Sequence, residues 1–260
     1  MRETINRYFT CFSTCLSTGS GLADLMVFLI GLCIGSFGGM VAARLPAGEP
    51  FGGRSHCPSC RQTLGPRELM PVLSYVVQKG RCKHCGEKIS PAYITVELST
   101  AIAFLVLYKR FGLGLVGVLH MIVALHLCIL AGTDIMYGLL PNRILLSASG
   151  FALILRLAQV WPIQGWASLI DGFWGACFGF GSLFAVALMK PGAMGGGDVK
   201  MAGAIGLYLG FPKILSGLAL GFTMSAAYSI PLLLLGRLKA TDTIPLGVFL
   251  AFGTIWAVAA

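Results

Sequence analysis

The sequence predicts an all-α polytopic membrane protein of about eight transmembrane helices, with a small cytoplasmic loop domain between the first two. Composition and the repetition of apolar runs carry this prediction. Of the 260 residues, 56% are hydrophobic and only 11% are charged, against about 25% charged in ordinary soluble domains. Apolar runs, most near the roughly 20 residues needed to cross a bilayer, recur between short interruptions marked by Gly, Pro and charge. This composition argues against an ordinary soluble fold.

Each apolar run is expected to form one helix. The first is taken as a retained helix, because it exceeds the apolar core of a signal peptide and lacks a small-residue cleavage site. The sixth is shorter than a bilayer requires. The runs cover residues 22–43, 93–108, 113–133, 143–161, 166–189, 199–212, 214–236 and 244–260. We divide the chain accordingly into residues 1–43 with the first helix, a loop domain at 44–92 and a membrane domain at 93–260.

The basic residues are distributed unevenly between the two sides of the predicted bundle. Lys and Arg in short loops stay on the cytoplasmic side during membrane insertion. With eight spans and the N-terminus outside, 13 of the 19 basic residues are cytoplasmic. The net charge of +9 then faces anionic membrane lipids, and no nucleic-acid partner is needed to explain it. These residues are Arg44, Arg54, Arg61, Arg67, Lys79, Arg81, Lys83, Lys88, Arg143, Lys190, Lys200, Arg237 and Lys239.

The only long polar segment contains four cysteines in two pairs, Cys57-Pro-Ser-Cys60 and Cys82-Lys-His-Cys85, separated by 21 residues. This spacing is close to that of zinc sites with four cysteine ligands. Such a shell is tetrahedral and leaves no open catalytic position. Two disulfides are the alternative, which a loop in the reducing cytosol disfavours. We therefore predict a structural Zn²⁺ bound by these four thiolates.

Other cysteines and the loop histidines are not expected to bind metal. Isolated cysteines usually pack as small apolar residues. His56 and His84 lie beside the pairs, but the four thiolates complete the shell without them. The isolated cysteines are Cys11, Cys15, Cys33, Cys128 and Cys177.

Two aspartates are candidate functional residues. Only ten acidic residues are present, and a carboxylate within the membrane is costly enough to be a functional candidate by default. Asp134 ends the third predicted span, in Gly132-Thr-Asp-Ile-Met-Tyr-Gly-Leu-Leu-Pro-Asn142. Asp198 opens the sixth, in Gly195-Gly-Gly-Asp-Val-Lys200. The parity of the spans puts both on the cytoplasmic side.

Two adjacent carboxylates share one proton, because neighbouring like charges do not both ionise. One then takes a proton from the attacking water, and the other protonates the carbonyl oxygen and leaving amine of a peptide bond. Asp134 and Asp198 therefore predict an aspartyl protease site. Glycines 195–197 would admit close approach of a substrate strand, and Lys200 is expected to tune the charge of the pair. The alternative is structural, with each aspartate paired to a cation such as Lys200 or Arg143.

Three other aspartates are assigned ordinary roles. Asp24 and Asp171 fall at the outer ends of their spans, where acids favour helix starts. Asp242 lies in the cytoplasmic segment between the last two spans and is expected to be a solvated helix-cap acid.

Five sequence blocks resemble a known family. They are Gly35-Ser-Phe with Arg44-Leu-Pro46; the cysteine pairs with Gly80-Arg-Cys82 and Val96-Glu97; the Asp134 segment ending in Pro141-Asn142; Gly195 to Lys200; and, more weakly, Ile244 to Ala251. Over about residues 35–253 the sequence resembles the bacterial type IV prepilin leader peptidases. The last aspartate block alone also resembles archaeal preflagellin peptidases and presenilins, whereas the paired cysteines are characteristic of the bacterial enzymes.

The resemblance implies an aspartyl endopeptidase at the cytoplasmic face of the bacterial inner membrane. It would remove the basic leader of type IV prepilins or type II secretion pseudopilins, with Asp134 and Asp198 as the catalytic pair. Many members also methylate the new N-terminus with S-adenosylmethionine, and Gly80 matches a glycine linked to that step. Glu97 is expected to orient the loop or bind substrate.

The sequence departs from the family pattern at a few positions outside the aspartate blocks. Gly38-Gly39 replaces Leu-Asn, and Leu69 replaces Asn before Met70-Pro71. Ala92 and Ile94 stand where Arg and Pro are common. These changes leave the peptidase motifs intact and bear on methylation.

Two functions of other classes are weighed against the peptidase. A proton-coupled transporter would use Asp134 and Asp198 as proton relays near mid-span and would carry internal repeats, neither of which the sequence contains. A membrane-anchored zinc-ribbon binding module would leave both aspartate segments unexplained.

Overall fold

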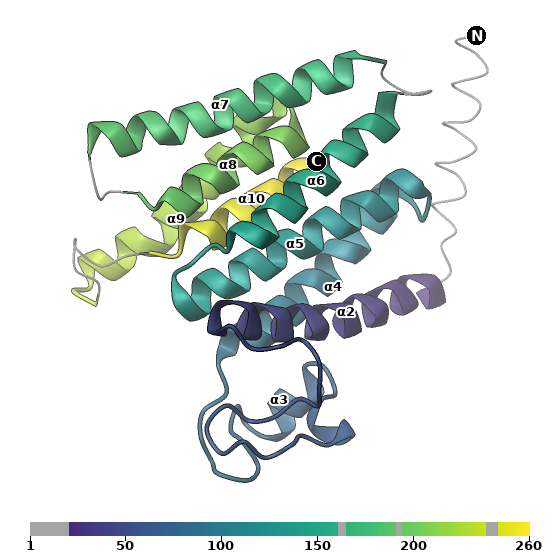
Figure 1. Ribbon diagram of the computed structural model, residues 1–260, viewed down its shortest axis with the longest axis vertical. Helices are drawn as coiled ribbons and strands as arrows, with labels where there is room; N and C mark the ends of the chain where they lie inside the picture. The colour runs from purple at the N-terminus through teal and green to yellow at the C-terminus, as the bar shows by residue number, and fades with distance from the viewer. Residues whose placement is uncertain (1–20, 161–164, 191–193, 238–243) are drawn as a thin grey trace.

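The computed structural model describes residues 21–160, 165–190, 194–237 and 244–260, and within them every element longer than one turn is an α-helix. Eight long helices form a bundle, and the short α3 lies in a loop domain beside α2 (Figure 1). The long helices are α2 (Gly21–Ala47), α4 (Pro91–Phe111), α5 (Leu115–Tyr137), α6 (Asn142–Gln159), α7 (Ala167–Met189), α8 (Gly196–Leu209), α9 (Lys213–Leu234) and α10 (Leu246–Ala259). The loop domain contains a 3₁₀ turn, η1 (Pro66–Glu68), and α3 (Leu73–Val77).

Each predicted apolar run forms one of these helices. Five of them, α2, α4, α5, α7 and α9, are long and apolar enough to cross a membrane. Helices α8 and α10 have 14 residues each, or about 21 Å at 1.5 Å per residue, against a hydrocarbon core of about 30 Å. The chain is therefore a multi-pass helical membrane protein, and the number of eight spans stays a prediction.

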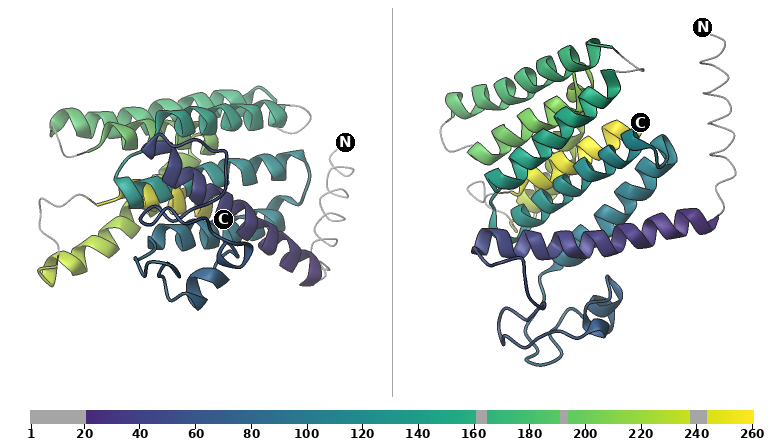
Figure 2. Two further views of the ribbon diagram at one scale, coloured as in Figure 1. Left: turned by 60° about the horizontal axis from the view of Figure 1, so that its bottom comes forward. Right: turned by 45° about the vertical axis from the view of Figure 1, so that its right-hand side comes forward.

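Successive long helices run in opposite directions, so their ends gather at two sides of the bundle (Figures 1 and 2). One side carries the C-terminal ends of α2, α5, α7 and α9 and the N-terminal ends of α4, α6, α8 and α10. The loop domain joins α2 to α4 and so projects from this side. Asp134, in the last turn of α5, and Asp198, in the first turn of α8, lie at the same side.

Helices α2 and α4 approach closely because glycine faces the contact. A Cβ on Gly31 would lie 2.6 Å from Cα of Ala101, and one on Gly35 would lie 2.8 Å from Cα of Glu97. Small residues allow such backbone approach inside membranes, where packing replaces the hydrophobic effect as the main attraction between helices. Gly35 thereby lets α2 pack directly against the backbone of α4 at Glu97.

Candidate functional site

Asp134 lies where α5 ends. The helix stops at Gly138, whose φ of 61° is left-handed and whose N–H donates to the carbonyl oxygen of Asp134 at 2.9 Å. Glycine adopts this conformation without the steric cost of a Cβ. The Asp134 side chain is buried, with 8% of its surface exposed, and Asp198 is half-buried.

Three segments distant in sequence converge on these carboxylates. A Cβ on Gly247 would lie 2.9 Å from Oδ2 of Asp134 and 3.2 Å from Cδ2 of Leu140. A Cβ on Gly197, next to Asp198, would lie 3.0 Å from Cβ of the same Leu140. Leu140 thus lies between the two aspartate segments.

The N-terminal ends of two helices, α8 and α10, lie at Asp198 and Asp134. Asp198 is in the first turn of its own helix, and the backbone amides of Gly247 and Val248, in the first turn of α10, lie beside Asp134. Helix N-termini stabilise negative charge through their free N–H groups. Within the described residues, Oδ2 of Asp134 is buried without a hydrogen-bond partner.

The alternative prediction was that each aspartate pairs with a cation. The described residues do not form such pairs. Lys200 donates from Nζ to Oδ1 of Asn142 at 3.0 Å, and neither aspartate makes an ion pair in the described ranges. Lys200 therefore ties α8 to the start of α6. Asn142, which the sequence blocks contain, and Gly247, in the weakest block, were not singled out as site residues.

The other aspartates lie away from the pair. Asp24 forms an ion pair with Lys109 at 3.0 Å, at the opposite side of the bundle, and Asp171 lies near the start of α7 at that side. Asp242 is outside the described residues.

The four predicted zinc ligands lie together in the loop domain. Their sulfur atoms are all within 4.8 Å of one another. The Sγ atoms of Cys57 and Cys85 are 3.9 Å apart, near the separation of about 3.8 Å that tetrahedral geometry with Zn–S bonds of about 2.3 Å requires. This is far beyond the S–S bond length of about 2.05 Å, so a disulfide between these two is excluded.

Two matching turns hold these thiols. In the first, the N–H of Arg61 donates to the carbonyl of Cys57 at 2.9 Å, and in the second the N–H of Gly86 donates to that of Cys82 at 2.9 Å. Both donors have positive φ, 59° and 74°. The backbone N–H of Cys60 is the largest cause that lowers the pKa of the Cys57 thiol to about 7. A thiolate is the form that binds metal, and the four clustered sulfur atoms fit a structural Zn²⁺.

The remaining cysteines and histidines lie outside this cluster. Cys128 is buried as predicted, whereas Cys33 and Cys177 are exposed on their helices, so the packing prediction is wrong for them. Their outward faces meet an apolar bilayer, where a thiol carries little cost. His84 lies 3.1 Å from Glu68 and His56 lies 3.9 Å from Glu49, so neither histidine joins the sulfur cluster. Cys11 and Cys15 are outside the described residues.

Replacing Cys57 with Ser is expected to lower bound zinc from about one ion per chain to below about 0.2, because a hydroxyl is a poor ligand for this metal. Metal analysis of the purified protein after dialysis measures this ratio. Cys177→Ser, exposed on α7, is the matched control and should retain the metal. An unchanged zinc content in the Cys57 variant would rule out the four-cysteine site.

Glu97 and Gly80 lie at the junction of the loop domain and the bundle. Glu97 is buried in α4, and its Oε2 accepts a hydrogen bond from the N–H of Val72 at 2.7 Å. It therefore connects the loop to the membrane helices. Gly80 has a φ of 67°, and a Cβ there would lie 3.0 Å from the Tyr75 hydroxyl. Gly80 and Glu97 are both separate from the aspartate pair.

The fold and these sites define a class: multi-pass membrane proteins with two carboxylates at one end of a helical bundle and a four-cysteine loop on the same side. Residues 121–230 match the family model described as Type IV leader peptidase family, and residues 29–111 match the Bacterial Peptidase A24 N-terminal domain. The chain belongs to the type IV leader peptidase family. The family predicted from the sequence blocks is thereby confirmed.

Similar proteins of known name support this membership. The prepilin leader peptidase/N-methyltransferase of Bacillus subtilis (strain 168) is 37% identical over 233 residues, covering 89% of this chain and 92% of that protein. The protein of the same name from Klebsiella pneumoniae is 32% identical, over 72% of this chain and 86% of that protein. The type 4 prepilin-like proteins leader peptide-processing enzyme of Escherichia coli O78:H11 is 31% identical, over 78% of this chain and 74% of that protein. No solved structure matches the chain significantly.

Proposed function

We propose that this protein is an aspartyl endopeptidase that removes the basic leader from type IV prepilins or type II secretion pseudopilins, with Asp134 and Asp198 as its catalytic pair. The convergence of the two carboxylates through Leu140 is the observation that carries the proposal. Membership of the leader peptidase family supports the reaction, and the names of the relatives support the substrate class.

The chemistry follows from two carboxylates that share one proton. The ionised member takes a proton from water as the water oxygen attacks the peptide carbonyl, and the protonated member donates to the carbonyl oxygen. Collapse of the tetrahedral intermediate then breaks the C–N bond, and the leaving amine receives a proton. The first-turn amides of α8 and α10 stabilise negative charge near the pair.

The side of the membrane is part of the proposal. The loop domain contains eight of the chain's basic residues, which favours a cytoplasmic location, and the aspartate pair lies on the same side of the bundle. A prepilin with its apolar helix in the bilayer holds its basic leader at the cytoplasmic surface. The scissile bond then lies at the depth proposed for Asp134 and Asp198.

Two cofactors complete the proposal. Structural Zn²⁺ would be held by the four clustered thiolates. S-adenosylmethionine would supply the methyl group if this chain shares the N-methyltransferase activity named for its relatives.

The test is cleavage of a prepilin by the purified protein in detergent, followed by intact-mass analysis of the product. We expect a mass loss equal to the leader. A prepilin with the residues around the cleavage site deleted serves as the control substrate and should stay intact. Failure of folded, zinc-loaded protein to cut any tested prepilin or pseudopilin would overturn the proposal.

A further inference from the structure

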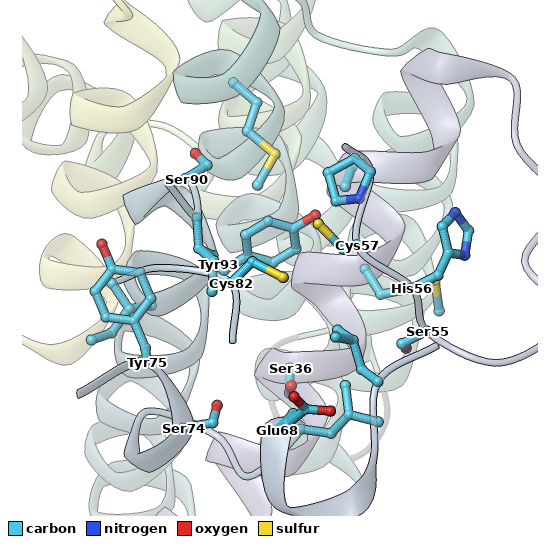
Figure 3. Close-up of a pocket in the computed structure, with 18 of the residues that line it drawn as sticks. Ser36, Ser55, His56, Cys57, Glu68, Ser74, Tyr75, Cys82, Ser90 and Tyr93 are labelled. Atoms are coloured by element: carbon cyan, nitrogen blue, oxygen red, sulfur yellow. The ribbon is translucent and has the colours of Figure 1, made fainter. Parts of the chain in front are cut away.

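The two sides of the bundle hold different features. The side that carries the aspartates also has a pocket of about 540 Å³ between the loop domain and the ends of α2, α4 and α5, with Tyr93 and Glu97 in its lining (Figure 3). At the opposite side, the start of α5 and the ends of α6 and α8 contribute one polar side chain each to a buried cluster. Its members are His120, Arg156 and Tyr208, each with 5–6% of its surface exposed. The chemistry proposed above uses none of these three.

His120 links α5 directly to α8. Its Nδ1 atom forms a hydrogen bond of 2.7 Å with the hydroxyl oxygen of Tyr208. The imidazole ring also stacks on the ring of Phe111, with centroids 4.1 Å apart, and meets the Tyr208 ring edge-on at 5.4 Å. Phe111 is the last residue of α4. The His120 ring is therefore held between α4 and α8.

Arg156 binds the end of α8. Its Nε donates to the carbonyl of Leu207 at 3.0 Å, and its Nη2 donates to that of Tyr208 at 2.7 Å. The last carbonyls of a helix lack partners within the helix and carry partial negative charge, which a cation stabilises. Gly210 ends α8 with a φ of 72°, and a Cβ there would lie 2.5 Å from Nη2 of Arg156. Glycine at this position therefore lets the guanidinium reach the helix end.

Stability alone is a poor explanation for this cluster. The cost of burying a guanidinium offsets much of what its hydrogen bonds contribute. Nε2 of His120 is buried without a hydrogen-bond partner in the part of the chain that the structure describes. A partly satisfied polar cluster stabilises a bundle less than well-packed apolar side chains do. Buried polar groups can instead specify one arrangement of helices, as a polar residue fixes the register of a coiled coil.

Helix α8 needs such a constraint. With 14 residues, it is about 21 Å long, so its length does not fix its depth in a hydrocarbon core of about 30 Å. Asp198 follows three glycines, which constrain the backbone little. The position of Asp198 therefore depends on how the neighbouring helices hold α8. Lys200 ties the start of α8 to Asn142 of α6 at 3.0 Å, and the buried cluster holds its other end.

We infer that His120, Arg156 and Tyr208 are positioning residues that hold α8 at the height along α5 where Asp198 meets Asp134, an inference that rests on the proposed function. The same two helices carry the His120–Tyr208 hydrogen bond at one end and the two aspartates at the other. The helix between the bond and each aspartate is about 21 Å long in α5 and about 15 Å in α8, at 1.5 Å per residue. A shift at one end of such a helix moves its other end, so loss of the bond should displace Asp198 from Asp134.

Tyr208→Phe tests this inference, because it removes the hydroxyl and keeps the ring. We expect the kcat of leader cleavage to fall about tenfold, less than the roughly 10²-fold that a 1 Å misplacement of a catalytic group can cost. The KM should stay within about twofold of wild type, because the change is remote from the bound peptide and acts on the chemical step. Tyr228→Phe removes the same group from the exposed face of α9. It is the matched control and should keep both values.

The double variant His120→Phe/Tyr208→Phe separates positioning from stability. Tyr208→Phe alone leaves Nδ1 of His120 without its partner and should lower the unfolding midpoint. Replacing both partners with apolar rings leaves no unpaired group, so the midpoint of the double variant should return to within about 3 °C of wild type. Its kcat should stay low, because the tie between α5 and α8 is still missing. A wild-type kcat in this stable double variant would show that the pair contributes only to stability and would overturn the inference.

The wild type in the same assay distinguishes the two proposals. A wild type that cleaves prepilin, with Tyr208→Phe and the double variant at the same kcat, would overturn the positioning role and leave the peptidase proposal standing. Folded, zinc-loaded wild type that cleaves no tested prepilin or pseudopilin would overturn the proposed function and this inference together.

Discussion

Replacement of either Asp134 or Asp198 with Asn is expected to reduce the kcat/KM of leader cleavage by at least about 10³-fold, in line with the loss of a positioned acid–base group. The amide has almost the shape of the carboxyl, but it does not take a proton from water or donate one as the acid does. Both variants should fold, because neither aspartate forms an ion pair within the described residues. Intact-mass assays with a prepilin substrate measure the rates.

Asp24→Asn and Asp171→Asn are the matched controls for these variants. Both remove a carboxylate from the opposite side of the bundle, and both should cleave at close to the wild-type rate. Circular dichroism and zinc content establish that each protein is folded. A catalytic acid or base usually contributes more than about tenfold to the rate. If Asp134→Asn or Asp198→Asn loses less than about tenfold in kcat/KM, that aspartate is not a catalytic residue.

The positions of the helices could be predicted from the sequence, because the apolar run that marks each helix is a local feature. Each apolar run indicates a helix buried in lipid, and the glycines and prolines between the runs indicate where the chain turns. The number of spans is harder, since α8 and α10 are apolar but have only 14 residues each. Whether such a helix crosses the bilayer depends on its neighbours and on local bilayer thickness, which no single run encodes.

The site was predictable only in part, because some of its features depend on contacts between distant segments rather than on local sequence. Asp134, Asp198 and the paired cysteines were identified because they are chemically unusual in an apolar chain and have recognisable spacing. Leu140 and Gly247 were not, because their importance comes from contacts between segments far apart in sequence. The pocket beside Glu97 was also not predicted, since it needs the loop domain, α2, α4 and α5 to meet.

The packing of α10 on Asp134 supports a second prediction that separates activity from stability. Gly247 lies in the first turn of α10, and a Cβ there would be 2.9 Å from Oδ2 of Asp134. Real Cβ atoms do not approach that closely, so Gly247→Ala should displace the carboxylate. Misplacement of a catalytic group by about 1 Å can cost about 10²-fold, and we expect a loss of that size in kcat/KM.

The same substitution should leave the fold intact. Alanine is favoured over glycine in a helix by up to about 1 kcal/mol, which offsets the small cost of moving one short side chain, so the unfolding midpoint should stay within about 3 °C of wild type. Gly150→Ala in α6 is the control, because a Cβ there meets nothing within 4 Å; it should keep both activity and stability. If Gly247→Ala cleaves at the wild-type rate, the first turn of α10 does not set the position of Asp134 during catalysis. The backbone amides of that turn then do not have the charge-stabilising role proposed for them.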